Sequence, residues 1–216
     1  TNDLAGKTRL SDVSVRKIPL KDLTVKADKE SYTYGDDITL TASVKMEGYW
    51  DIWYYWYERN TQLGKNANPF VIQKPTAGTH TYICTAQANN GYSLSQSITV
   101  NVTPKSITGA EVALAQNSFE YDGTAKTPTV SEVKLGETIL TSADYDVTVT
   151  PQTNVGSGYT LTVTGKGNYT GTATAVWSIT PKPVTANVTV DGEKFTYTGS
   201  EITPAVTVKD GETVIP

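Results

Sequence analysis

Apolar and polar residues alternate along most of this chain, the pattern of half-buried strands. Valine, isoleucine, leucine, alanine or tyrosine stands at every second position, with mostly threonine or serine between, in the segments Ile38–Val44, Ser97–Val102, Tyr145–Thr150 and Tyr159–Thr164. Side chains of a strand point alternately to its two faces, so each segment has one apolar and one hydroxyl-rich face. Threonine suits the wet face because its β-branch fits the pleat.

Turn signals separate these segments, and no window has the apolar spacing of a helix. Glycine, aspartate and asparagine cluster at Tyr34–Asp37, Asn89–Gly91, Tyr121–Gly123, Gly156–Gly158 and Asp191–Gly192. Short strands at such spacing are typical of β-sandwiches. The pattern therefore predicts an all-β fold built of tandem β-sandwich modules in an elongated array.

Four blocks of sequence recur in order. Val102–Thr108 recurs as Ile179–Thr185, Phe119–Gly123 as Phe195–Gly199, Pro128–Val130 as Pro204–Val206, and Gly136–Leu140 as Gly211–Ile215. The offset drifts only from 77 to 75 residues. We interpret this as one complete β-repeat and the truncated start of a second.

The recurring Thr-Pro-Lys sequences mark the joints, because proline ends ladder pairing and stiffens the connection. They predict a leader or remnant strand at 1–22, a first module at 23–103, a complete repeat at 104–181 and a truncated repeat at 182–216. A lone hairpin is marginal in water. We therefore expect residues 182–216 to add to a sheet edge of the 104–181 module or of a neighbouring chain.

The first module resembles an immunoglobulin-like domain. Gly78–Cys84 is similar to its strand F, in which a tyrosine two residues before a cysteine forms the tyrosine corner. Trp56 stands where the core tryptophan of strand C belongs, and Ala42 where strand B would carry the partner cysteine. The resemblance implies a β-sandwich without the inter-sheet disulfide, in which Cys84 is a small buried hydrophobe.

The repeat resembles the threonine-rich "Tyr-Asp-Gly" repeats of large bacterial cell-surface proteins. The resemblance rests on Tyr121–Gly123, Ser142–Val147, Gly165–Gly171 and Trp177–Lys182. It implies an extracellular stalk or adhesive segment, associated with the cell surface or cell wall, and it brings no catalytic residues.

Composition excludes several functions. A net charge of −4 and an acidic pI argue against a nucleic-acid partner, and no apolar run is long enough to predict membrane insertion. One cysteine and one histidine cannot form a multi-histidine metal site, and no phosphate loop or nucleophile elbow is present. We expect no cofactor, no metal and no catalytic residues. Calcium at Asp36, Asp37 or Asp191 is the open alternative to turn aspartates.

The best candidate site is Tyr49–Tyr57, in which seven of nine residues are aromatic. If Trp56 points into the core, Trp50, Ile52 and Tyr54 share its inward side. Trp53, Tyr55 and Tyr57 then form a row on an outer face that can stack sugar rings or anchor a protein. Packing against neighbouring strands is the alternative.

Together these features predict a non-catalytic stalk or adhesin segment of a bacterial surface protein. It would space the chain and bind a host or cell-surface glycan or protein through the aromatic face. The alternative is a carbohydrate-binding module of a secreted polysaccharide-active enzyme.

Overall fold

The computed structural model describes residues 19–47, 51–192 and 194–215. Every regular element in these ranges is a strand, which confirms the all-β prediction. The described residues fall into two compact units. One contains residues up to 110 together with 135–146 and 164–173, and the other contains 111–134, 147–163 and 174 onward. Each described sheet takes its strands from one side of Pro104 only, while the domain boundaries expected from the sequence stay predictions.

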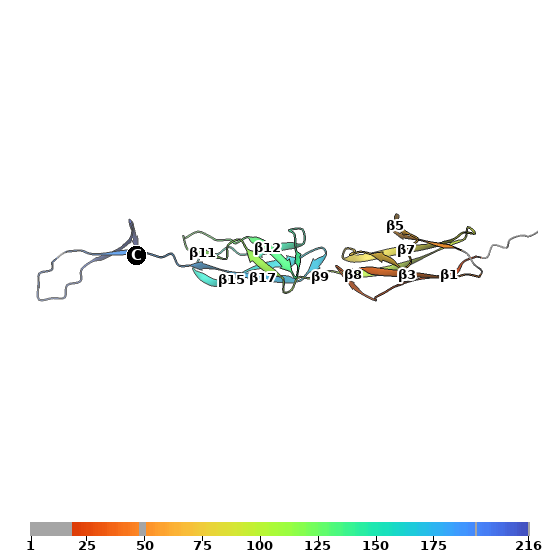
Figure 1. Ribbon diagram of the computed structural model, residues 1–216. Coiled ribbons are helices and arrows are strands. Elements are labelled where there is room, and N and C mark those ends of the chain that lie inside the picture. Colours follow the sequence, from red (N-terminus) through yellow and green to blue (C-terminus); the bar gives the residue numbers. More distant parts are fainter. Residues whose placement is uncertain (1–18, 48–50, 193, 216) are drawn as a thin grey trace, which may run out of the picture. The chain divides into compact units, whose positions relative to one another are not determined.

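Residues 20–103 form two facing sheets, which we call the N-terminal sandwich (Figure 1). The first sheet has the order β1-β3-β6, and the second has the order β2-β8-β7-β4-β5. Immunoglobulin-like sandwiches likewise place strands A, B and E in one sheet and C, F and G in the other. The strand bounds are β1 Lys21–Ala27, β2 Tyr32–Thr33, β3 Ile38–Lys45, β4 Ile52–Glu58, β5 Thr61–Lys65, β6 Phe70–Ile72, β7 Gly78–Ala88 and β8 Ser93–Thr103.

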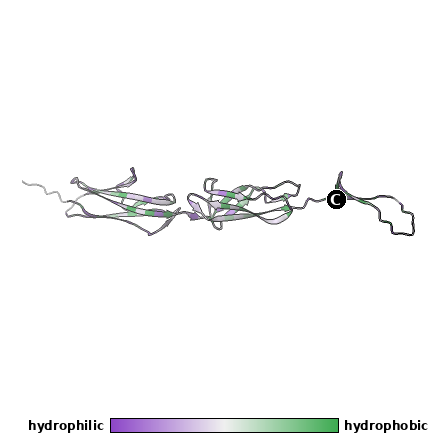
Figure 2. Cartoon of the chain, turned by 180° about the vertical axis from the view of Figure 1, so that it is seen from behind, coloured by the Kyte–Doolittle hydropathy of each residue, from purple (hydrophilic) through white to green (hydrophobic). Residues whose placement is uncertain are grey.

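Both sheets contribute to one hydrophobic core, and Figure 2 shows hydrophobic and hydrophilic residues interspersed along the strands. Leu20 packs into this core, and β1 begins at Lys21. Residues 1–18, where most of the leader or remnant strand is expected, lie outside the described residues. The buried core residues are Leu20, Leu23, Tyr32, Ile38, Leu40, Ala42, Trp56, Tyr82, Cys84, Ala86, Ala88, Val100 and Val102.

The position expected for an inter-sheet disulfide is filled by a buried thiol and a methyl group. Cys84 is a free, buried cysteine, and Ala42 lies in the same core, as the resemblance implied. Burial raises the pKa of the Cys84 thiol to about 12. The prediction of a tyrosine corner is wrong in one respect, the hydrogen bond of its hydroxyl. Tyr82 is buried, but its hydroxyl has no hydrogen-bond partner among the described residues.

Residues 105–180 form a two-stranded, a three-stranded and a four-stranded sheet, with the orders β16-β9, β10-β12-β13 and β11-β17-β15-β14. Their core holds Trp177, whose ring contacts Phe119 and Tyr159 at centroid distances of 5.8 Å and 5.1 Å. The bounds are β9 Lys105–Ser106, β10 Glu111–Leu114, β11 Ser118–Glu120, β12 Val130–Leu135, β13 Thr138–Ile139, β14 Tyr145–Val149, β15 Gly156–Gly165, β16 Tyr169–Thr170 and β17 Thr172–Thr180.

Residues 182–215 form a separate antiparallel sheet of β18 (Ala186–Val190), β19 (Val206–Asp210) and β20 (Thr213–Ile215). Among the described residues these strands pair only with one another. The described residues thus show no addition to a sheet edge of the 104–181 module, and addition to a neighbouring chain stays a prediction. The two-residue turn Gly211–Glu212 joins β19 to β20 and supplies this pairing locally.

The pairing of β18 with β19 reproduces that of β10 with β12. Val112 faces Val133 in one pair, and Val188 faces Val208 in the other. The first pair has a register shift between Ala113 and Leu114, and the second pair has none. A β-bulge inserts one extra residue into a strand. The change of the repeat offset from 76 to 75 residues is thus the loss of one bulge residue.

The sheet β10-β12-β13 and the sheet β18-β19-β20 differ in how deeply their valines are buried. Val133 is fully buried, whereas its counterpart Val208 is only half-buried and Val188 is 61% exposed. Residues 182–215 contain one sheet, and a single sheet has no second layer against which to bury its apolar face.

Candidate functional site

The direction of each side chain on β4 follows from its pairing with β7. Trp56 lies opposite the buried Cys84, and Tyr54 lies opposite the buried Ala86. Since alternate residues of a strand point to opposite faces, Trp53, Tyr55 and Tyr57 lie on the outer face of the five-stranded sheet. The structure thus places all three predicted site residues on one face. Trp50, also assigned to the inward side, lies outside the described residues.

Trp56 anchors this arrangement from inside the core. Its indole stacks on Phe70 with the ring centroids 5.6 Å apart, and its Nε1 donates a hydrogen bond to the Ala67 carbonyl at 2.7 Å. Gly64 lies opposite Trp56 on β5, and a Cβ there would collide with the Phe70 ring. Glycine therefore makes room for the stacked pair, which holds β4 in one register and the outer row in place.

We call Trp53, Tyr55 and Tyr57 the aromatic row. The residues that flank it are mostly polar. Trp53 is 37% exposed, and the two tyrosines are half-buried. The same face carries residues paired with the row across β7 and β8: Gln87 and Ser93, Thr85 and Ser95, and Ile83 and Ser97. On β5, the Lys65 Nζ lies 5.5 Å from the centre of the Tyr55 ring.

Several of these polar groups bond to each other. The hydroxyls of Thr85 and Ser95 are 2.8 Å apart, and those of Thr81 and Thr99 are 3.2 Å apart. The face therefore offers aromatic rings beside a row of hydroxyls. Such a face stacks on flat apolar surfaces and exchanges hydrogen bonds with polar ones.

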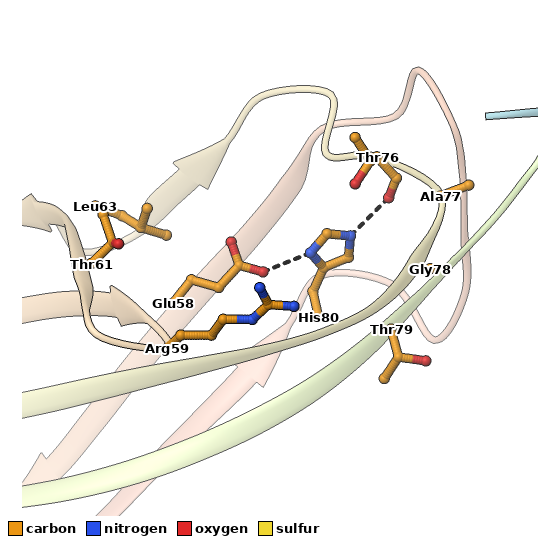
Figure 3. Close-up of a pocket in the computed structure, with 9 residues that line it drawn as sticks. All are labelled: Glu58, Arg59, Thr61, Leu63, Thr76, Ala77, Gly78, Thr79 and His80. Carbon is orange, nitrogen blue, oxygen red and sulfur yellow. Dashed lines mark hydrogen bonds and ion pairs between the residues drawn. The ribbon is translucent and has the colours of Figure 1, made fainter. Parts of the chain in front are cut away.

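A pocket of about 470 Å³ lies at one end of the sandwich, between the β4–β5 turn and the loop before β7 (Figure 3). Inside it, His80 Nδ1 lies 2.7 Å from Glu58 Oε1, and His80 Nε2 lies 2.7 Å from the Thr76 carbonyl oxygen. Both ring nitrogens thus face acceptors. Which of the two acceptors receives a ring N–H depends on the tautomer of the imidazole.

The sequence did not lead us to pair His80 with Glu58. The signal was present, since Glu58 shares the inward parity of Trp56, and His80 shares that of Cys84. The pairing of Glu58 with Tyr82 on β7 brings the two side chains together. Burial, with the Glu58 carboxylate nearby, raises the pKa of Tyr82 to about 12.

Two of the three aspartates considered for calcium accept hydrogen bonds from backbone amides. Asp36 Oδ2 accepts a hydrogen bond from the Thr33 amide at 3.1 Å, and Asp37 Oδ1 accepts one from the Lys74 amide at 3.1 Å. In the described ranges, no three His, Cys, Asp or Glu side chains are grouped so as to hold a metal ion. The described residues also contain no helix that is long and apolar enough to span a membrane.

Comparison with known proteins gives distant structural likenesses only. No protein-family profile and no curated protein matches the chain. The fibronectin(III)-like modules of Clostridium thermocellum CbhA are 15% identical, with a TM-score of 0.31, over 73% of this chain and 95% of theirs. Bacteroides ovatus SGBP-B, in complex with a mixed-linkage heptasaccharide, is 13% identical with a TM-score of 0.32 over 74% of this chain, which spans 48% of that protein.

Three N-terminal domains of the bacteriophage RB49 outer capsid protein Hoc are 16% identical, with a TM-score of 0.31, over 93% of this chain and 70% of theirs. The description of this chain as all-β, with an immunoglobulin-like strand order in the N-terminal sandwich, rests on its own strand pairing.

Proposed function

We propose that this chain is a non-catalytic segment of a bacterial surface protein, which binds a glycan or protein partner through the aromatic row. The observation that carries the proposal is the position of Trp53, Tyr55 and Tyr57 on one outer sheet face. Contiguous apolar patches on a protein surface often mark an interaction site. Hydroxyl and amide groups beside the row favour a ligand that is itself rich in hydroxyls.

Spacing is the second part of the proposed function. Modules that each bury their own core and are joined by short proline-containing connections extend a chain with few residues per unit length. The complete repeat at 104–181, with its proline-containing joints, suits this role in an extracellular stalk or adhesin. A carbohydrate-binding module of a secreted polysaccharide-active enzyme would use the same face, and the glycan it selects distinguishes the two functions.

The test is binding of the full chain to a broad array of cell-surface and plant glycans, followed by titrations that monitor tryptophan fluorescence. Trp53→Ala is expected to abolish the response. Tyr121→Ala is the matched control, because Tyr121 is a similarly exposed aromatic residue, at 39%, outside the row.

Binding of a structural cell-wall polysaccharide from plants supports the enzyme-module alternative, and binding of a host glycan supports the adhesin. If no glycan binds, and a screen against host surface proteins also shows no dependence on Trp53, the row has only a packing role.

A further inference from the structure

Arg59 stands at the end of the aromatic row, in a turn that disfavours it. Glu58 pairs with Thr61, so Arg59 and Asn60 form a two-residue hairpin turn between β4 and β5. Arg59 has a φ of +53°, in the left-handed region where L side chains meet steric hindrance. Hairpin turns with positive φ usually take Gly, Asn or Asp. A residue kept in a strained conformation is a candidate for a functional role.

The guanidinium of Arg59 is also uncommitted. No described residue forms a hydrogen bond or an ion pair with it, although its neighbour Glu58 is an acceptor within the same pocket. The Glu58 carboxylate is instead bonded to the His80 ring. The pocket therefore pairs a carboxylate that is already engaged by the His80 ring with a guanidinium that no described residue engages. In Figure 3 the Arg59 side chain points in the direction of His80.

Two hollows meet at Arg59. The pocket of about 470 Å³ exposes the side chains of Thr61, Thr76 and Thr79. A second hollow of about 280 Å³ is lined by Thr79, Thr81 and Ile83 together with Glu58 and Arg59. Ile83 lies opposite Tyr57, the last member of the aromatic row. A ligand lying along the row therefore reaches Arg59 at the end of the strand.

We propose that Arg59 binds the carboxylate of an acidic saccharide whose neighbouring rings lie on Trp53, Tyr55 and Tyr57. This inference rests on the proposed function and adds the class of ligand. A guanidinium holds a carboxylate through two parallel hydrogen bonds, and its single charge balances a single carboxylate. The threonine hydroxyls around Arg59 suit the hydroxyls of the same sugar.

The experiment measures affinities of the full chain for oligogalacturonates, alginate oligomers and hyaluronan oligomers, each compared with its own methyl ester. The ester keeps every ring and removes only the charge. At least one acid is expected to bind about tenfold more tightly than its ester, a preference equivalent to about 1.4 kcal/mol. Added salt should reduce this preference, since the contact is exposed.

Three variants locate the effect. Arg59→Gly removes the preference for the acid, while its melting temperature stays equal or rises because glycine accepts the positive φ. Arg59→Lys keeps the charge but loses the two-pronged contact, so it retains only part of the preference. Lys74→Gly is the matched control. Lys74 is another cation at positive φ, +42°, in the same sandwich, and it lines neither hollow, so its removal leaves the preference unchanged.

The outcomes separate this inference from the proposed function. Binding of neutral glycans that depends on Trp53, with no preference for an acid and no effect of Arg59→Gly, overturns the role of Arg59 and leaves the aromatic row standing. Equal binding of sulfated saccharides or of acidic peptides at Arg59 overturns the assignment to carboxylate sugars. Absence of any saccharide binding overturns both the ligand class and the glycan arm of the proposed function.

Discussion

Trp53 and Trp56 lie three residues apart on β4, and the structure assigns them opposite roles. Trp56 is 1% exposed and belongs to the core, while Trp53 is 37% exposed on the outer face. Replacing each in turn by alanine removes the same atoms from the two faces of one strand. The difference between the unfolding free energies of the two variants therefore shows which face of β4 points into the core.

The magnitudes follow from the contacts. Trp56→Ala removes a fully buried indole, its stacking on Phe70 and its hydrogen bond to Ala67, and is expected to cost about 3–5 kcal/mol of unfolding free energy. Trp56→Phe keeps an apolar ring but leaves the Ala67 carbonyl without its donor, at a cost of about 1–3 kcal/mol. Trp53→Ala removes cross-strand contacts on an open face, worth about 1 kcal/mol or less.

Equilibrium unfolding in urea, followed by far-ultraviolet circular dichroism, gives these free energies without relying on tryptophan emission. Because the chain contains more than one core, the analysis uses the transition that Trp56→Ala displaces. If Trp53→Ala destabilises that transition as much as Trp56→Ala does, the assignment of the two faces is wrong. If neither variant moves it, Trp56 is not a core residue.

Three further predictions test other parts of the structure. The Cys84 thiol, whose pKa burial raises to about 12, should resist a thiol-specific reagent in the native chain at pH 8 and react at once in guanidinium chloride; rapid native reaction would contradict its burial. The pKa of Asp28 is lowered, first by the hydrogen bond from the Tyr32 hydroxyl at 2.6 Å and then by that from the Thr39 amide, so its contribution to stability is present above the pKa of the unfolded chain and is lost as the pH falls through the folded value. Asp28→Asn should therefore lower the melting temperature at pH 7 and make the melting temperature fall less steeply in acid. An equally steep fall would count against the role of the hydrogen bonds from Tyr32 and Thr39 to Asp28. Finally, Val133→Ala should cost about 2 kcal/mol in the unfolding of residues 105–180, and Val208→Ala much less, because Val133 is fully buried and Val208 half-buried; equal costs would refute the difference in coverage of the two sheets.

Features that depend on neighbours along the chain were predictable. Alternation predicted β3, β8, β14 and β15 to within a few residues, because the two-residue period of side chains is a local property of a strand. One buried residue then determines the direction of every other on its strand. Taking Trp56 as inward was therefore enough to place Trp53, Tyr55 and Tyr57 on the outer face. The drop of the repeat offset from 76 to 75 residues also reflected the β-bulge in β12, because the bulge is one extra residue in the first repeat.

Features that depend on which residues meet across strands were decided by the tertiary structure alone. Glu58 and His80 come together through the register of β4 with β7, and a shift of one residue would turn one of them outward. The hollows at Arg59 require the β4–β5 turn and the loop before β7 at the same end of the sandwich. The unpartnered Tyr82 hydroxyl had no local signal. Pairing between distant strands depends on turns and on the covering layer, and neither is written in the pattern of any single segment.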